Sequence, residues 1–83
     1  MKIRVRYFAS LREALGPDER VELPAGGTAA AARDLLLARG GRHAEVLARG
    51  RAVRCAVNQT MADENTPLAD GDELAFFPPV TGG

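Results

Sequence analysis

The side chains that most often carry out chemistry in proteins are sparse in this sequence and stand apart from one another. The chain of 83 residues holds one cysteine, Cys55, and one histidine, His43. A metal site needs three or four ligands, and neither residue has further ligands at the usual spacing. No histidine stands near Cys55 in the sequence to activate its thiol. We therefore expect Cys55 to be a small core residue and His43 to bind no metal.

Two glycine-containing motifs could bind ions but lack the residues that such sites require. The segment Asp70-Gly71-Asp72 resembles a fragment of a calcium loop, which would need six or more oxygen ligands, so a tight turn is predicted. Gly26-Gly27 precedes a predicted helix, without the further glycines or the lysine of a phosphate-binding loop. We interpret it as an ordinary loop before the helix.

The last residues of the chain form the strongest candidate site. After Phe77, the six residues Pro78-Pro79-Val80-Thr81-Gly82-Gly83 carry no charged side chain. The two prolines favour an extended path, and the two glycines make the tip thin and flexible. We expect residues 78–83 to be a flexible, extended tail that can present its terminal carboxylate inside a narrow tunnel of another protein. The alternative is a frayed terminus with no role.

The size and charge of the chain exclude several classes of function. At 8.8 kDa it is predicted to form one small domain. Eleven basic residues balance eleven acidic ones, so no overall positive charge indicates binding to nucleic acid or to a membrane surface. The sequence has no apolar run long enough to span a membrane. A single cysteine fits a reducing compartment, and we expect the protein to be cytoplasmic.

The balanced total hides an uneven distribution of charge. Residues 1–54 hold all eleven Lys and Arg and six of the acids, whereas residues 55–83 hold five acids and no base. The two parts could neutralise each other within the fold, or the segment from Asp63 to Glu73 could form an acidic face for a basic partner.

Alternation of apolar and polar residues predicts the strands. The pattern indicates strands over residues 2–8, 20–23, 53–57 and 73–77. Residues 58–62 either continue the third strand or turn it back.

The main helix is predicted over residues 29–39, with Thr28 as N-cap and Gly40-Gly41 as the stop. Its apolar stripe consists of Ala31, Ala32, Leu35, Leu36 and Ala38, which leaves Arg33, Asp34 and Arg39 on the solvent side. Short helical turns are predicted over residues 10–15, with Ser10 and Glu13 as a capping box, and over residues 43–49, with Val46 and Leu47 packed inward.

This order of elements predicts an α+β, β-grasp domain over residues 1–77. The predicted mixed sheet has four to five strands, with the first and last strands parallel at its centre, and one main helix crosses one face.

Several motifs resemble those of the small subunit of molybdopterin synthase, the MoaD family, which has a ubiquitin-like β-grasp fold. They are Ala56-Val57-Asn58-Gln59-Thr60, Pro67-Leu68, Asp70-Gly71-Asp72-Glu73 and the stretch from Ala75 to Gly83. Tyr7-Phe8-Ala9, Leu11-Arg12-Glu13 and Gly16 add to the likeness. The resemblance spans the chain and is densest over residues 56–83.

The resemblance implies a chemical role for the terminal residue, Gly83. In the family, an E1-like (MoeB-like) enzyme uses ATP to adenylate the terminal carboxylate, and a persulfide donor converts it to a thiocarboxylate. Gly82, which has no side chain, allows the tail to enter a MoaE-like large subunit. There the tail gives its sulfur to cyclic pyranopterin monophosphate, which forms the dithiolene of molybdopterin. The family assembles as a heterotetramer of two small and two large subunits. The chain itself is expected to bind no cofactor or metal and to be no complete enzyme alone.

The resemblance also implies a surface that binds the partner. Its expected members are Phe8, Arg12, Met61, Phe76, Phe77, Pro78, Pro79, Val80 and Thr81. Neighbouring residues of a strand point to opposite faces, so one of Phe76 and Phe77 must be in the core, and Phe77 is exposed if Phe76 is buried. Met61 suits the core and a contact surface equally.

Three alternatives stay open. The chain could be a sulfur carrier of another pathway, such as the thiamin-forming ThiS type. It could be a ubiquitin-like modifier that joins Gly83 to a lysine of a target protein. It could also be an interaction domain whose tail is inert.

Overall fold

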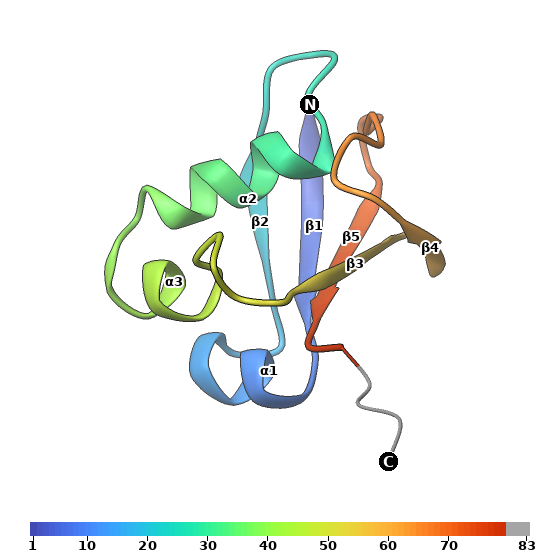
Figure 1. Cartoon of the computed structure of the whole chain (residues 1–83). Coiled ribbons are helices and arrows are strands. Elements are labelled where there is room, and N and C mark those ends of the chain that lie inside the picture. The colour runs from blue at the N-terminus through green and yellow to red at the C-terminus, as the bar shows by residue number, and fades with distance from the viewer. Residues whose placement is uncertain (80–83) are drawn as a thin grey trace.

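The computed structural model describes residues 1–79, and Val80, Thr81, Gly82 and Gly83 lie outside the described residues. Eight elements follow one another along the chain (Figure 1). They are β1 (Lys2–Tyr7), α1 (Ala9–Leu15), β2 (Asp18–Glu22), α2 (Ala29–Leu37), α3 (Gly41–Val46), β3 (Arg54–Val57), β4 (Thr60–Ala62) and β5 (Glu73–Phe77).

The strands form one mixed sheet in the order β2-β1-β5-β3-β4. β1 and β5 are parallel, with Arg4 beside Glu73 and Tyr7 beside Phe76. The other neighbours are antiparallel. This is the predicted β-grasp arrangement, with the first and last strands paired at the centre of the sheet.

One face of the sheet is covered, and the core lies beneath the helices. Ile3, Val5, Leu36, Leu47 and Leu74 are fully buried. Figure 1 shows α2 across this face, α3 beside α2, and α1 at the end of the sheet where β1 and β5 finish. Successive side chains of a strand point to opposite faces, so every second side chain of each strand lies on the face that the helices leave uncovered.

A tight turn decides between the two predictions for residues 58–62. Asn58 and Gln59 both have positive φ angles, 49° and 67°, which is the backbone of a two-residue hairpin turn. β4 therefore turns back and pairs antiparallel with β3, with Met61 beside Ala56. The Asn58 side chain donates to Asp72 at 3.0 Å and accepts from the Glu73 amide at 3.0 Å, which ties the hairpin to the start of β5.

The predicted capping box at Ser10 and Glu13 is wrong. The N-cap of α1 is Phe8, whose side chain caps nothing, and whose carbonyl accepts from the amides of Leu11 and Arg12. The Phe8 amide is bonded to the Phe76 carbonyl at 3.2 Å, so the strand pairing runs up to Phe8 and the helix begins directly after it. By contrast, the predicted N-cap of α2 is confirmed, since the Thr28 hydroxyl accepts from the Ala31 amide at 3.2 Å.

The predicted apolar face of α2 is partly wrong. Ala32 and Leu36 are buried as expected, but Ala31 and Leu35 are only half-buried and Ala38 is exposed. Arg33, which we expected on the solvent side, is 3 % exposed. The helix is therefore rotated so that a guanidinium group faces the interior.

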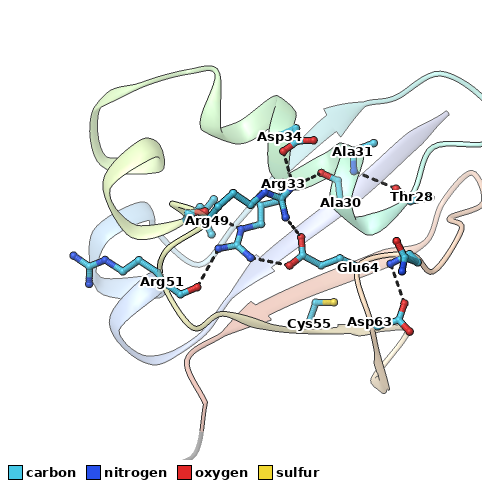
Figure 2. Close-up of polar contacts among 12 residues, drawn as sticks. Thr28, Ala30, Ala31, Arg33, Asp34, Arg49, Arg51, Cys55, Asp63 and Glu64 are labelled. Atoms are coloured by element: carbon cyan, nitrogen blue, oxygen red, sulfur yellow. Dashed lines mark hydrogen bonds and ion pairs between the residues drawn. The ribbon is translucent and has the colours of Figure 1, made fainter.

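Arg33 is buried because it binds the segment that follows α3 (Figure 2). Its guanidinium donates to the carbonyls of Leu47 at 2.8 Å, Ala48 at 2.7 Å and Arg51 at 3.3 Å, and to Glu64 at 2.8 Å. These bonds satisfy the backbone of a segment without regular structure, which hydrophobic packing alone could not do.

A second polar cluster joins α3 to the sheet. The Glu19 carboxylate of β2 accepts from the Tyr7 hydroxyl at 2.7 Å and lies 2.7 Å from His43 Nε2, and Arg39 also pairs with it. His43 is thus a structural partner of a carboxylate. Burial raises the pKa of Glu19, but the hydrogen bonds from His43, Tyr7 and Arg39 outweigh burial, and its pKa is lowered.

Candidate functional site

The candidate site is the uncovered face of the sheet, at the end where β5 leads into the two prolines. Phe77 of β5 and Arg54 of β3 are partners in the sheet register, and Phe8 directly follows β1, with its amide bonded to the Phe76 carbonyl. Pro78 and Pro79 follow Phe77 directly and are half-buried. The tail therefore begins directly after Phe77 at this end of the sheet, and its first two residues are partly covered.

The two adjacent phenylalanines of β5 divide between core and surface. Phe76 is 1 % exposed and packs in the core, whereas Phe77 is half-buried on the outer face. The conditional prediction that Phe77 is exposed if Phe76 is buried agrees with these positions. Phe76 consequently stabilises the strand from which the tail leaves, and of the two rings only Phe77 is accessible to a partner.

Small residues form the floor of this face. Ala56 of β3 and Ala75 of β5 lie side by side in register and are 8 % and 5 % exposed. Met61 of β4 lies beside Ala56 and is 60 % exposed. Of the two environments considered for Met61, the structure shows the exposed one. A large apolar side chain next to a shallow alanine floor is typical of a contact surface.

Phe8 is fixed by a neighbouring cation. The guanidinium carbon of Arg6 lies 5.1 Å from the centre of the Phe8 ring, within the range of a cation–π contact. Arg6 also pairs with Glu73 at 3.5 Å. These contacts orient the half-buried ring and neutralise Glu73, one member of the segment that we considered as an acidic face.

Arg12 lies on α1 and is exposed. α1 contacts β1 and β5, so its position places Arg12 at the same end of the molecule as Pro78. The structure thus brings together Phe8, Arg12, Phe77, Pro78 and Pro79 at this end, with Met61 farther along the outer face. Phe76 does not share the surface. The expected roles of Val80, Thr81, Gly82 and Gly83 lie outside the described residues.

Two hollows flank the start of the tail. One of about 130 Å³ lies between α1, α3 and Pro78, and Arg51 forms part of its wall. The other, of about 360 Å³, lies beside Pro79 and is lined by residues 52–55 and 62–64. The segment from Arg51 to Cys55 separates them, and this is the segment whose backbone Arg33 binds at Arg51.

Cys55 occupies the inward strand position that we predicted. It is 3 % exposed, and its thiol lies 3.4 Å from the Ala62 carbonyl. Burial raises the pKa of the thiol, and the charges of Glu64 and Asp63 act in the same direction. A thiol that resists ionisation is a poor nucleophile, so the geometry fits a core residue.

The segment from Asp70 to Asp72 forms the predicted tight turn. Gly71 has a φ of 87°, and Asp72 accepts from the Ala69 amide at 2.8 Å. This bond and the one from Asn58 lower the pKa of Asp72. Among residues 1–79, no group of three His, Cys, Asp or Glu side chains is arranged to hold a metal ion.

The acidic residues of the second part of the chain have several internal partners. Glu64 pairs with Arg33 at 2.8 Å and also with Arg49, and Glu73 pairs with Arg6. Internal neutralisation, one of the two interpretations of the charge distribution, therefore accounts for Glu64 and Glu73.

The sequence analysis did not place Arg51 and Arg54 beside the start of the tail. Both are exposed and line the hollows beside the prolines. Alternation along β3 could have placed Arg54 on the outer face, since it is two residues from Ala56. Nothing in the sequence indicates that Arg51 comes to lie beside Pro78, because that proximity depends on the binding of its carbonyl by Arg33.

No helix of the described region, residues 1–79, is long and apolar enough to cross a membrane.

Comparisons with known proteins place the chain in a family. The model of the ThiS family matches residues 5–83. The molybdopterin synthase sulfur carrier subunit of Escherichia coli is 44 % identical over 81 residues, which cover 98 % of this chain and 99 % of that protein.

Two solved structures share the fold and the length. A small archaeal modifier protein of Haloferax volcanii is 28 % identical, with a TM-score of 0.77 over 95 % of this chain and 98 % of that one. A complex of subunits 1 and 2 of the molybdopterin-converting factor of Helicobacter pylori contains a chain that is 28 % identical, with a TM-score of 0.70 and full coverage of both chains. The β-grasp fold, the matched family and the full-length relative agree, and the chain belongs to the ThiS family and, within it, to the sulfur carrier subunits of molybdopterin synthase, the MoaD family.

Proposed function

We propose that this protein is the sulfur carrier subunit of a molybdopterin synthase and that Gly83 carries the sulfur. The main support is that the tail begins at the outer face of the sheet, where Met61 is exposed, Phe8 and Phe77 are half-buried, and Ala56 and Ala75 form the floor. The face can bind a partner while the residues beyond Pro79 enter it. The similarity to the Escherichia coli carrier over nearly the whole chain supports the same role.

The chemistry starts from a carboxylate, which is a poor electrophile because its charge repels nucleophiles. An E1-like adenylating enzyme joins the Gly83 carboxylate to AMP and releases pyrophosphate from ATP. A persulfide sulfur then attacks the carbonyl carbon and AMP leaves. The acyl disulfide that results is cleaved by a thiol, which leaves a thiocarboxylate on the carrier and an oxidised disulfide on the donor.

The thiocarboxylate is the reactive group in the second half of the cycle. Its sulfur is a better nucleophile than a carboxylate oxygen, and it attacks cyclic pyranopterin monophosphate inside the large subunit. Transfer of sulfur and hydrolysis return the Gly83 carboxylate. The chemistry needs no catalytic thiol of this chain, which agrees with the burial of Cys55. No cofactor bound by this chain takes part.

The partner in this proposal is a MoaE-like large subunit. The complex of subunits 1 and 2 from Helicobacter pylori supports such a pairing, since one of its chains shares the fold and the length of this protein. We propose a heterotetramer of two carriers and two large subunits, located in the cytoplasm. Alone, the carrier is a regenerated co-substrate.

The intact mass of the protein tests the proposal. The chain is incubated with its activating enzyme, ATP and a persulfide donor. A gain equal to the replacement of one oxygen by sulfur is expected, and a variant without Gly83 should show none. If AMP is released and the mass does not change, the sulfur-carrier function is wrong.

A second candidate function is protein modification. The Haloferax volcanii modifier protein has the same fold at 28 % identity. In this case Gly83 would form an isopeptide bond with a lysine of a target. Adducts that survive reducing denaturing electrophoresis and contain a Gly83–lysine linkage in peptide mass spectra would favour it, whereas sulfur transfer to a pterin acceptor favours the first function.

A further inference from the structure

Three arginines from different parts of the chain lie at the end of the molecule where the tail starts. Arg12 lies on α1, Arg51 borders the hollow beside Pro78, and Arg54 borders the hollow beside Pro79. Arg54 is also paired in register with Phe77. We refer to Arg12, Arg51 and Arg54 as the arginine collar.

The charges of the collar are not neutralised within the described part of the chain. Residues 1–79 place no carboxylate within 4.0 Å of these three guanidinium groups, although five other arginines are paired: Arg4, Arg6, Arg33, Arg39 and Arg49. All three collar side chains are exposed.

The nearest acidic side chains reduce this positive charge only in part. Glu13 follows Arg12 in the sequence, and Asp63 and Glu64 line the same hollow as Arg54. Glu64 is bound by Arg33 and Arg49, and Asp63 accepts from the Asn65 amide at 2.8 Å. The collar therefore keeps a positive excess.

The acids of the turn before β5 lie at the opposite end of the sheet. Asp70 accepts from the Lys2 amide at 2.6 Å, and the Gly71 amide donates to the Lys2 carbonyl at 2.8 Å. Lys2 begins β1, whereas the tail starts where the parallel strands β1 and β5 end. These acidic side chains therefore lie beside Lys2 and the chain start, away from the collar.

In the proposed complex the collar has no part in the reaction itself. Four residues separate Pro79 from the end of Gly83, which amounts to about 13 Å when extended. When the tail is inserted in a partner, the collar meets the surface around the opening, while the carboxylate reacts deeper inside.

From this placement we propose that the arginine collar docks on an acidic rim around the opening of the large subunit that receives the tail. The inference rests on the proposed function, which supplies the partner. Opposite charges on the two surfaces steer the encounter and orient the tail toward the opening, an effect that increases the rate of association and weakens with salt. The adjoining apolar face then contributes short-range affinity.

Association rates measured by stopped flow with the large subunit of the same organism test the collar. The double variant Arg51→Glu/Arg54→Glu is compared with the wild type at low and high salt. Reversal of two charges is expected to slow association on the order of tenfold at low ionic strength, with a smaller difference at 0.5 M salt. The association rate of Arg51→Gln/Arg54→Gln should lie between the rate of the wild type and the rate of the charge-reversed variant.

Arg20→Glu is the matched control. Arg20 is an exposed arginine on β2, at the sheet edge opposite β3 and β4. Arg20→Glu is compared with the single variant Arg54→Glu, which reverses the same number of charges, and Arg20→Glu should leave the rate within about twofold if position matters. Circular dichroism melts verify that all variants are folded.

The outcomes separate the two proposals. If the wild type does not bind the large subunit, the proposed function is wrong. If it binds and the collar variants associate as fast as the wild type, or if Arg54→Glu associates no more slowly than Arg20→Glu, the proposed role of the collar is wrong. The collar proposal is also contradicted if the variants associate more slowly with the activating enzyme but not with the large subunit. The acidic rim would then belong to the activating enzyme.

Discussion

Met61 can contribute to binding without contributing to folding, because more than half of its side chain is exposed on the edge strand β4. Truncation of such a residue removes contact area from a partner while the core stays intact. We predict that Met61→Ala weakens binding to the large subunit roughly tenfold, as measured by isothermal titration calorimetry. The melting temperature should stay within about 2 °C of that of the wild type.

Thr60→Ala serves as the control for this prediction. Thr60 is the neighbour of Met61 on β4 and points to the other side of the sheet. An equal loss of affinity in both variants would show that the edge strand is disturbed as a whole and that Met61 has no specific role.

At the scale of the elements, a buried polar contact joins α2 to the segment between α3 and β3. Arg33 of α2 donates hydrogen bonds to carbonyls of that segment (Figure 2). In Arg33→Met the side chain keeps its bulk, but three carbonyls and Glu64 lose a donor. We expect a loss of about 3 kcal/mol in the free energy of unfolding, measured by urea denaturation.

Arg49→Met is the comparison for this element. Arg49 also binds Glu64, together with Asp34, but its side chain is 46 % exposed. Surface pairs contribute little, so a loss of about 1 kcal/mol or less is expected. Equal losses in the two variants would contradict the view that burial makes Arg33 essential.

The contact between His43 of α3 and Glu19 of the sheet predicts how the stability of the fold changes with pH. Folding lowers the pKa of Glu19, so the unfolded chain binds more protons in acid and stability falls as the pH falls. The stabilisation by Glu19 is complete above the carboxyl pKa of the unfolded chain, about 4.3, and is lost below the lowered pKa. Tyr7, His43 and Arg39 face this carboxylate.

Glu19→Gln should therefore be less stable than the wild type at pH 5, and the difference should shrink toward pH 2. Urea denaturation at several pH values measures it. Glu45→Gln, an exposed position on α3, provides the control. A difference between Glu19→Gln and the wild type that stays constant over this range would mean that the charge of Glu19 is not what stabilises the contact.

The strands could be predicted from the sequence because their alternation records burial on one face, as in Ile3, Val5 and Tyr7. The rotation of α2 could not, because its small apolar residues leave several faces equally suitable for packing. The buried face was decided by Arg33, and sequence patterns treat an arginine as a surface residue. The capping box failed for a related reason, since strand pairing at Phe8 fixed the start of α1.

At the scale of the whole molecule, the candidate site could be predicted where the residues follow a motif. Phe8, Phe77 and the prolines lie at one end of the sheet, and their role in binding a partner, which the resemblance implied, stays a prediction. The collar could not be predicted, because Arg12, Arg51 and Arg54 are far apart in the sequence and only the packing of α1 and the Arg33 contacts bring them to one end.

The residues that stabilise the fold are distinct from those of the tail, which is proposed to carry the sulfur. The buried core ends with Phe76, before the tail begins. We predict that a chain that ends at Pro79 unfolds with a free energy within about 0.5 kcal/mol of the full chain, as measured by urea denaturation. It should still bind the large subunit through the outer face and should transfer no sulfur. A chain that ends at Asp72 lacks β5 and is expected not to fold, which provides the contrast.

The central place of β5 has a consequence for how the protein is made. β1 leaves the ribosome first, but its parallel partner is β5, with Arg4 beside Glu73. The two strands of this pairing are far apart in the sequence, so the centre of the sheet cannot form before β5 has been synthesised. β3 needs the same strand, because β5 lies between it and β1. A nascent chain that stops before β5 therefore lacks the central strand of its sheet and has no folded surface to offer to a partner.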